Sequence, residues 1–280
     1  MAIEVAQALG TEILSADSRQ CYKGMAIGTA QPTPQERAAV PHHFVDEFPV
    51  TESLNAGFYE AYGRRVLEEI FRKNDVAVVC GGTGLYLKAL LEGLDEMPPV
   101  DGEVAAALEA GYKENGTEWL RDALRAADPK TFHAIDHDNP ARLLRALSFY
   151  RSTGKSLVDF RKNAPVERPF RTVKVGLDLP RPVLYDRINH RVVAMLEAGL
   201  LEEVKNLLPF RDLRPLQTVG YSELFRYLNG EWALEEAVDK IKQHTRNYAK
   251  RQMTWFRNAG GYEWILADSP DAAEQILERL

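Results

Sequence analysis

Several features that would define a broad class of protein are absent from this sequence of 280 residues. No apolar run is long enough to cross a bilayer, and residues 1–9 have neither the basic start nor the apolar centre of a secretory signal. Cys21 and Cys80 are the only cysteines, too few for a disulfide framework and too far apart for a paired-cysteine metal site. We therefore expect a cytoplasmic globular protein without a membrane partner.

Repeats, low-complexity tracts and two kinds of binding motif are also missing. The sequence contains no internal repeat and no low-complexity tract, and its apolar content of 45% is near the norm for a globular protein with a sizeable core. No His and Cys cluster has the spacing of metal ligands, so we predict no metal-binding residues. No segment matches GxxxxGK[ST], the phosphate-binding P-loop.

Charge is distributed unevenly along the chain. The net charge of −6 argues weakly against a nucleic-acid partner, because binding to phosphates depends on clustered basic groups. Residues 240–257, however, contain six lysines and arginines and no carboxylate, interleaved with Tyr248, Trp255 and Phe256. Such a segment is either a solvated helix face or a surface on which RNA bases stack.

The hydrophobic pattern predicts an α/β core. Short aliphatic runs at 12–15 and 76–80 are typical of buried parallel strands, and residues 173–179 alternate as a third strand would. Helical spacing between and after these strands predicts a βαβ arrangement with long C-terminal helices. The predicted helices cover residues 58–73, 85–91, 183–208, 220–228 and 234–258.

A helical insert is predicted within this core. The segment MPPVDG interrupts the chain after Glu96, and residues 103–150 are helical in pattern with breaks at NG, DP and NP pairs. The alternating strand at 173–179 then returns to the core. We therefore assign residues 1–95 and 168–280 to an α/β domain and 96–167 to the insert.

Polar residues follow two of the predicted strands, where open α/β sheets place their sites. Asp17 after the first strand could act as a base, cap a helix or bind Mg²⁺. Ser18, Arg19 and Gln20 either contact a ligand or stabilise a turn. Thr83, in GGTG after the second strand, either caps a helix or helps to bind an anion at its N-terminus.

Two pairs of arginines have helical spacing. Arg187 and Arg191 are four residues apart and could clamp a diphosphate, or they could be ordinary surface arginines. Arg142 and Arg145 are three apart on a predicted helix of the insert, where neighbouring leucines can pack inward.

Six segments together resemble one known family. They are SADSRQCYKGMAIGT, CGGTGLYLKALLEG, HDNPARLLRAL, RINHRVVAML, TVGYSELF and KRQMTWFR, and their order and spacing are similar to those of the tRNA dimethylallyltransferases over essentially the whole chain. The resemblance implies a P-loop-kinase-like parallel sheet with an inserted helical tRNA-binding domain. It also implies transfer of a dimethylallyl group from dimethylallyl diphosphate to the N6 amine of the adenosine 3′ of the anticodon.

The resemblance further implies a role for individual residues. Asp17 would be the general base, Thr83 would lie at the reacting centre, and Arg187 and Arg191 would bind the diphosphate. Mg²⁺ would accompany the diphosphate, held mostly by water and substrate oxygens. A monomer would bind the anticodon stem-loop through Ser18, Arg19, Gln20, Arg142, Arg145, Gln217, Gly220, Tyr221, Lys250, Arg251, Gln252, Trp255 and Arg257.

The chain departs from the family pattern at its start and at two positions. Family members open with a strand and a P-loop, so we expect an in-frame upstream segment of roughly 10 to 20 residues that carries both. Ala105 and Gln217 stand where family members commonly carry arginine. Two alternatives stay open: an adenylate dimethylallyltransferase, which the insert and the basic helix argue against, and a non-catalytic RNA-binding remnant without a diphosphate cradle.

Overall fold

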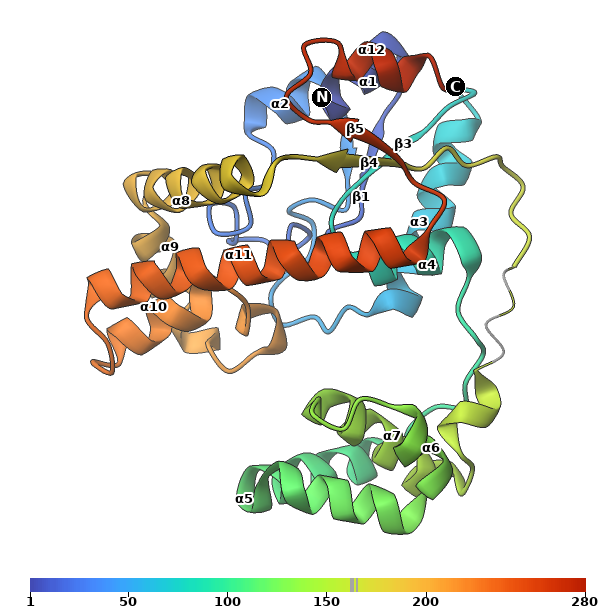
Figure 1. Ribbon diagram of the computed structural model, residues 1–280, viewed down its shortest axis with the longest axis vertical. Coiled ribbons are helices and arrows are strands. Elements are labelled where there is room, and N and C mark those ends of the chain that lie inside the picture. The colour runs from blue at the N-terminus through green and yellow to red at the C-terminus, as the bar shows by residue number, and fades with distance from the viewer. Residues whose placement is uncertain (162–163, 165) are drawn as a thin grey trace. The chain divides into compact units, whose positions relative to one another are not determined.

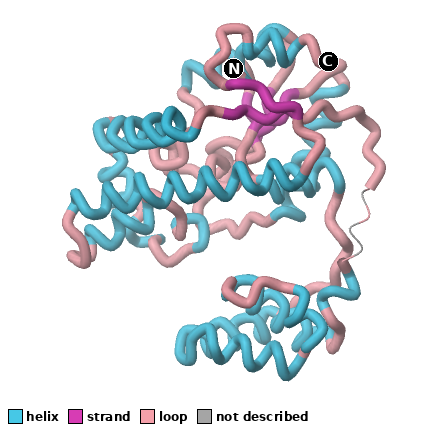
Figure 2. Tube along the Cα trace, in the orientation of Figure 1, coloured by secondary structure: helices cyan, strands magenta, loops and turns pink. Residues whose placement is uncertain are grey.

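The computed structural model describes residues 1–161, 164 and 166–280. The chain divides into two compact units, whose elements are labelled in Figure 1 and coloured by type in Figure 2. The first unit comprises Met1–Leu91 and Arg168–Leu280, and the second comprises Glu92–Glu167. The first unit contains the strands, so the α/β fold class is confirmed for this part of the chain.

All the strand pairs of the first unit are parallel. One sheet has the order β2-β1-β3, and Ile13 of its central strand lies opposite both His42 and Val78. A second sheet pairs β4 with β5, with Leu177 opposite Ile265. The bounds are β1 Ile13–Ser15, β2 His42–His43, β3 Val78–Cys80, β4 Val175–Asp178 and β5 Glu263–Leu266.

Helices pack around these strands. The side chain of Asn55 accepts a hydrogen bond from the Phe58 amide and so caps α3, while α4 begins at Gly84, shortly after β3 ends. α1 packs against α12, and α11 packs against both α8 and α10. The bounds are α1 Ala2–Ala8, α2 Pro34–Ala39, α3 Ala56–Phe71, α4 Gly84–Glu92, α8 Arg181–Glu197, α9 Leu200–Asn206, α10 Tyr221–Leu228, α11 Leu234–Ala259 and α12 Ala272–Leu277.

The single helix predicted over residues 183–208 is wrong. α8 ends at Glu197, and Gly199 has a φ of 100°, in the left-handed region that glycine adopts without steric cost. The chain therefore turns at this glycine, and α9 begins directly after it. Because of this break, α9, which carries Glu203, does not continue along the axis of α8.

The core of the first unit joins the sheet to the C-terminal helices. Leu14 of β1, Tyr59 of α3, Tyr86 of α4 and Tyr221 of α10 are all buried in one cluster. The rings of Tyr59 and Tyr86 stack with centroids 4.4 Å apart. Burial of side chains from both segments of the unit ties residues 1–91 to residues 168–280.

The second unit is helical. It contains α5 (Gly102–Ala127), α6 (Pro129–Ala134) and α7 (Pro140–Thr153), and its separate core includes Leu120, Leu124, Leu143 and Phe149. The predicted break at an NG pair is present as a kink in α5, where Gly116 has a φ of 77°. This core gives the second unit its own source of hydrophobic stabilisation.

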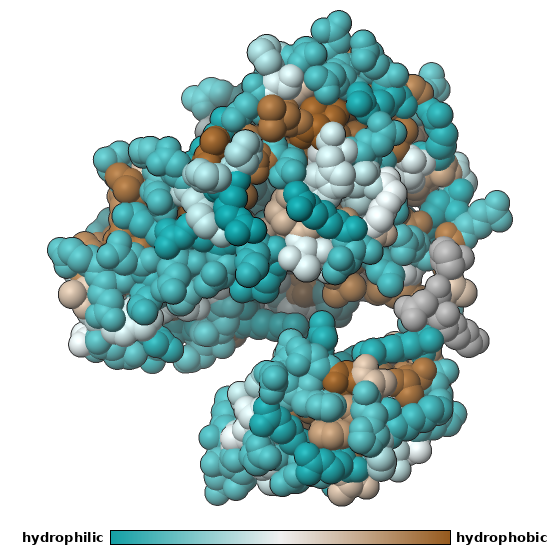
Figure 3. Space-filling view, in the orientation of Figure 1, coloured by the Kyte–Doolittle hydropathy of each residue, from teal (hydrophilic) through white to brown (hydrophobic). Residues whose placement is uncertain are grey.

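The surface is largely polar on the face shown in Figure 3, where apolar residues form small patches. Within the part of the chain that the structure describes, no helix is long and apolar enough to cross a membrane.

Candidate active site at the ends of β1 and β3

The carboxyl ends of β1 and β3 are joined by backbone and hydroxyl hydrogen bonds. The Ala16 amide donates to the Cys80 carbonyl at 2.8 Å, and the Thr83 amide donates to the Ala16 carbonyl at 3.0 Å. The hydroxyl oxygen of Thr83 accepts from the Ser18 amide at 3.0 Å. Residues 65 apart in sequence are thus brought together, with Asp17 directly between two of the bonded residues.

Asp17 shapes its own turn. Its Oδ1 accepts hydrogen bonds from the amides of Arg19 at 2.8 Å and Gln20 at 3.2 Å. This is the Asx-type turn that aspartate commonly makes with residues two and three positions later. Among the residues that the structure describes, no side chain or amide donates to Oδ2, so this oxygen can accept a proton.

Glutamine side chains brace the loop that follows. The amide nitrogen of Gln20 donates to the carbonyls of Thr29 at 3.3 Å and Ala30 at 2.9 Å, and its oxygen accepts from the hydroxyl of Ser15 at 3.2 Å. Gln31 donates back to the Gln20 carbonyl at 2.8 Å. The side-chain amide of Gln20 is therefore already engaged within the loop. The predicted RNA contact of Gln20 stays a prediction.

α11 lies directly against the GGTG turn. Gln252 donates to the Gly82 carbonyl at 2.9 Å, and a β-carbon added at Gly84 would lie 2.4 Å from the indole ring of Trp255. A β-carbon at Gly81 would lie 2.4 Å from the backbone of Ala16. Glycine is therefore required for close approach at this turn, and two predicted RNA-contact residues lie beside the predicted catalytic ones.

Tyr248, an aromatic residue of the basic segment 240–257, lies near enough to Asp17 to be affected by its charge, a position that the sequence pattern did not predict. Burial raises the pKa of its phenol, and the negative charge of Asp17 raises it further. The phenol therefore stays protonated and can donate a hydrogen bond, although 41% of the residue is exposed. Its position one helical turn before Gln252 was the available signal, because residues four apart share a helix face.

Arginine and cysteine groups complete the surroundings of Asp17. Arg19 donates to the Ser18 carbonyl at 3.0 Å, while its Nε is buried with no hydrogen-bond partner among the described residues. Burial raises the pKa of the Cys21 thiol to about 12, with the Asp17 charge as the second cause. Cys21 is therefore a protonated core residue at neutral pH.

The two arginines of α8 differ in their contacts. Arg187 forms an ion pair with Asp268, whereas Arg191 is exposed and forms no ion pair within the described residues. In the part of the chain that the structure describes, neither is hydrogen bonded to the turn residues at the strand ends. The predicted diphosphate clamp stays a prediction, and Arg191 is the one whose charge is available.

The basic residues near the end of α11 are exposed. Arg257 donates to Asp178 at 2.9 Å and lies over the ring of Trp264, and Arg251 lies over the ring of Tyr248. Lys250 is exposed. The charges of Lys250 and Arg251 are accessible to a polyanion, and that of Arg257 would be on release from Asp178, as the predicted tRNA contacts require.

The TVGY segment is held internally. Gln217 donates to the Arg211 carbonyl at 2.6 Å, and Gly220, with a φ of 97°, precedes α10. Tyr221 has 0% exposure, and its hydroxyl donates to Glu203 at 2.6 Å. The predicted tRNA contacts of these residues stay predictions, and the Tyr221 side chain has a separate internal partner.

In the second unit, the predicted tRNA-binding arginines lie on α7. Arg142 is 59% exposed and 3.8 Å from a carboxylate oxygen of Asp136, while Arg145 contacts the sulfur of Met97 at 3.9 Å. Both guanidiniums lie at the surface of this unit. Ala105 on α5 contributes no polar group.

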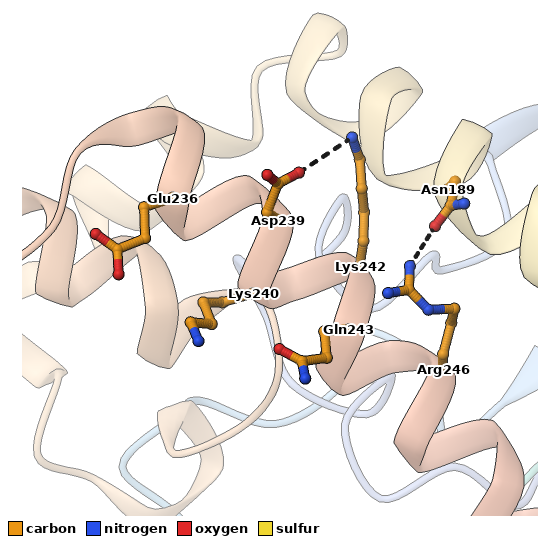
Figure 4. Close-up of a pocket in the computed structure, with 7 residues that line it drawn as sticks. All are labelled: Asn189, Glu236, Asp239, Lys240, Lys242, Gln243 and Arg246. Carbon is orange, nitrogen blue, oxygen red and sulfur yellow. Dashed lines mark hydrogen bonds and ion pairs between the residues drawn. The ribbon is translucent and has the colours of Figure 1, made fainter.

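A hollow of about 680 Å³ lies beside α8 and α11 (Figure 4). Arg246 donates to Asn189 at 2.7 Å, and Lys242 lies 3.8 Å from Asp239. The hollow therefore mixes charges of both signs. Its lining residues are Asn189, Glu236, Asp239, Lys240, Lys242, Gln243 and Arg246.

Known proteins similar to this chain were identified by sequence and by structure. The model of the IPP transferase family matches residues 20–259. A tRNA dimethylallyltransferase of Cytophaga hutchinsonii is 46% identical over 265 residues, which cover 95% of this chain and 87% of that protein.

Two solved structures have the same fold. The full-length tRNA isopentenylpyrophosphate transferase of Bacillus halodurans superposes with a TM-score of 0.70 and 37% identity, covering 99% of this chain and 88% of that one. A eukaryotic dimethylallyltransferase acting on tRNA superposes with a TM-score of 0.78 and 25% identity, covering 99% and 73%.

Proposed function

The chain belongs to the IPP transferase family, and we propose that it transfers a dimethylallyl group from dimethylallyl diphosphate to the N6 amine of the adenosine 3′ of the anticodon in tRNA. The supporting observation is the convergence at the ends of β1 and β3. A carboxylate whose Oδ2 has no partner among the described residues, a threonine hydroxyl and a helix with exposed cations meet there, as this reaction requires.

Asp17 acts as the general base in this proposal. The N6 nitrogen of adenine forms a bond to the allylic carbon, the bond from that carbon to the diphosphate oxygen breaks, and Oδ2 of Asp17 takes the proton from N6. The Asx turn orients the carboxylate, because Oδ1 is engaged by two amides. A positioned base of this kind contributes about 10²- to 10⁴-fold to the rate.

Thr83 orients the leaving group in this proposal. Its oxygen already accepts from the Ser18 amide, so its own proton is available to donate toward a diphosphate oxygen. The N-terminus of α4 lies next to it and favours an anion. Arg191, and Arg187 on release from Asp268, would neutralise the remaining charge.

Mg²⁺ would enter with the diphosphate. The described residues contain no group of three or more His, Cys, Asp or Glu side chains that could hold a metal ion, so a cage made only of protein ligands is not available there. Mg²⁺ commonly keeps several waters and uses substrate phosphates as ligands, which fits this donor set. The ion would supply charge neutralisation to the leaving diphosphate.

The anticodon stem-loop is the proposed RNA ligand of a monomer. Exposed Lys250, Arg251 and Arg257 on α11 would contact phosphates from the first unit, and Arg142 and Arg145 on α7 from the second. Ser18, Arg19, Gln20, Gln252 and Trp255 would surround the target nucleotide. A tRNA substrate implies action in the cytoplasm.

A titration against two ligands tests this function. The anticodon stem-loop should bind with a linear decrease of log affinity with log salt concentration, and each lost phosphate contact should lower the slope by about one. Adenosine monophosphate should bind far more weakly and accept no prenyl group. Equal affinity for the two ligands would favour the adenylate enzyme, and stem-loop binding without transfer would favour the RNA-binding remnant.

A further inference from the structure

Glu203 is a carboxylate of α9 that accepts three hydrogen bonds from other parts of the chain. The amide of Ile27 donates to its Oε2 at 2.8 Å, and the amide of Gly28 donates to its Oε1 at 2.9 Å. The hydroxyl of Tyr221 donates to Oε1 at 2.6 Å. One side chain therefore joins the loop after β1, α9 and the TVGY segment.

Tyr221 reaches this carboxylate because Gly28 leaves space for it. A β-carbon at Gly28 would lie 2.6 Å from the Tyr221 ring and hydroxyl. The ring is fully buried, and the Glu203 charge adds to burial in raising the pKa of its phenol. The tyrosine is thus a permanent hydrogen-bond donor to Glu203.

Hydrogen bonds connect the loop held by Glu203 to the turn that Asp17 makes with Arg19 and Gln20. Residues 27–28 directly precede Thr29 and Ala30, whose carbonyls accept from the Gln20 side chain. The backbone amide of Gln20 in turn donates to Oδ1 of Asp17. Every step between Glu203 and Asp17 is therefore a hydrogen bond or a covalent neighbour.

We propose that Glu203 is a positioning residue, which fixes the loop after β1 and so couples the TVGY segment to the orientation of the Asp17 carboxylate. This inference rests on the proposed function for its effect on catalysis. Its structural part, the dependence of the Asp17 turn on Glu203, stands apart from any activity.

Glu203→Gln is the test variant, since a glutamine of the same size has only one acceptor oxygen. Its NH₂ group must face a donor at one of the two carboxylate positions. Glu202→Gln is the matched control, because this neighbouring carboxylate is 70% exposed and pairs only with Lys205 among the described residues. Tyr221→Phe is a second variant, which removes one donor and keeps the ring in the core.

Amide hydrogen exchange, resolved by residue, tests the coupling. In Glu203→Gln the Ile27 and Gly28 amides should exchange about 10- to 10²-fold faster, as expected for loss of a hydrogen bond to a charged group. The Arg19 and Gln20 amides should also exchange faster, while Glu202→Gln should match the parent. Unchanged exchange at Arg19 and Gln20 in both Glu203→Gln and Tyr221→Phe would overturn the inference.

Measurement of kcat tests whether the coupling of Glu203 to the Asp17 turn affects catalysis. At saturating stem-loop and dimethylallyl diphosphate, Glu203→Gln should lower kcat by about 10- to 10²-fold, a loss typical of small misplacement of a catalytic group. Stem-loop affinity should change little, whereas a merely structural role would lower melting temperature and affinity with kcat unchanged. Tyr221→Phe should have a smaller effect that does not add to that of Glu203→Gln.

The two readouts separate this inference from the proposed function. A parent chain that binds stem-loop without prenyl transfer would refute the proposed function, and the exchange measurement would still decide the role of Glu203. Transfer by the parent with normal kcat in Glu203→Gln would refute the positioning role alone. If Glu203→Gln does not fold, Tyr221→Phe decides both readouts by the same criteria.

Discussion

Asp17→Asn separates the chemical role of this carboxylate from its structural role. Asparagine keeps an Oδ1 that can accept from the amides of Arg19 and Gln20, now at 2.8 and 3.2 Å, so the turn should persist. It replaces the free Oδ2 with an NH₂ group that cannot take a proton. Turnover should fall by about 10²- to 10⁴-fold, or roughly 3 to 5 kcal/mol of barrier.

The assay is transfer of a labelled dimethylallyl group to an anticodon stem-loop in a single turnover. Stem-loop affinity should change little, because the turn is preserved. Asp75→Asn is the control for the change in charge, since Asp75 is exposed and lies before β3, at the end of the strand opposite Cys80. Near-normal turnover by Asp17→Asn would refute the role of general base.

Asp17→Ala, compared with Asp17→Asn, distinguishes loss of the base from loss of the turn as the cause of a lower rate. Alanine removes both hydrogen bonds of the turn as well as the base, so the free energy of unfolding should fall by about 1 to 2 kcal/mol. The rate should fall at least as far as in Asp17→Asn. A slow alanine variant beside a normal asparagine variant would show that Asp17 only shapes the turn.

Three further perturbations test the site and its surroundings. Gly81→Ala should lower the free energy of unfolding, measured by urea denaturation, by about 1 to 3 kcal/mol, because its β-carbon would lie 2.4 Å from the backbone of Ala16. Gly57→Ala is the control, since its β-carbon would make an ordinary 3.4 Å contact and should leave the free energy of unfolding unchanged. Arg257→Met should reduce the salt slope of stem-loop binding by about one, while loss of its exposed pair with Asp178 should cost under about 1 kcal/mol of stability. Burial raises the pKa of the Cys21 thiol to about 12, so it should stay protonated in the folded protein, while the unfolded thiol ionises above about pH 9. The free energy of unfolding should therefore fall between these two pH values by up to about 1.4 kcal/mol per pH unit. Cys21→Ala should lessen that slope.

Local pattern was enough to predict the strands that carry the site. The runs ending at Ser15 and Cys80 are aliphatic and bounded by turn residues, and both form parallel strands as expected. Parallel strands in one sheet end at the same edge, so Asp17 and Thr83 could be expected near one another. Their proximity in the structure follows from the parallel direction of β1 and β3 together with their pairing as neighbours in the sheet.

Elements with weak local signals could not be predicted. β2 has only two residues, and the four residues of β5 do not alternate between apolar and polar, so neither provides the pattern that identifies a strand. The turn at Gly199 interrupts an otherwise helical pattern, and glycine also occurs inside helices. The pairing of such elements depends on tertiary contacts.

Contacts between distant segments were also beyond the sequence pattern. Gln252 and Gly82 are 170 residues apart, and Glu203 is 175 residues from Gly28. The ion pair of Arg187 with Asp268 likewise crosses 81 residues. Pattern reasoning finds which residue types suit a task, but the partner of a polar side chain depends on how the whole chain folds.

α11 links the predicted catalytic turn to the predicted RNA-binding cations. A single helix carries both Gln252 and Trp255, which pack on the GGTG turn, and exposed Lys250 and Arg251. Successive residues of a helix have fixed directions, so the backbone of Lys250 and Arg251 has a fixed place relative to the GGTG turn. In the proposed function, phosphates bound by these cations would be positioned by the same helix that contacts the GGTG turn, and stem-loop binding would then help to orient the target nucleotide.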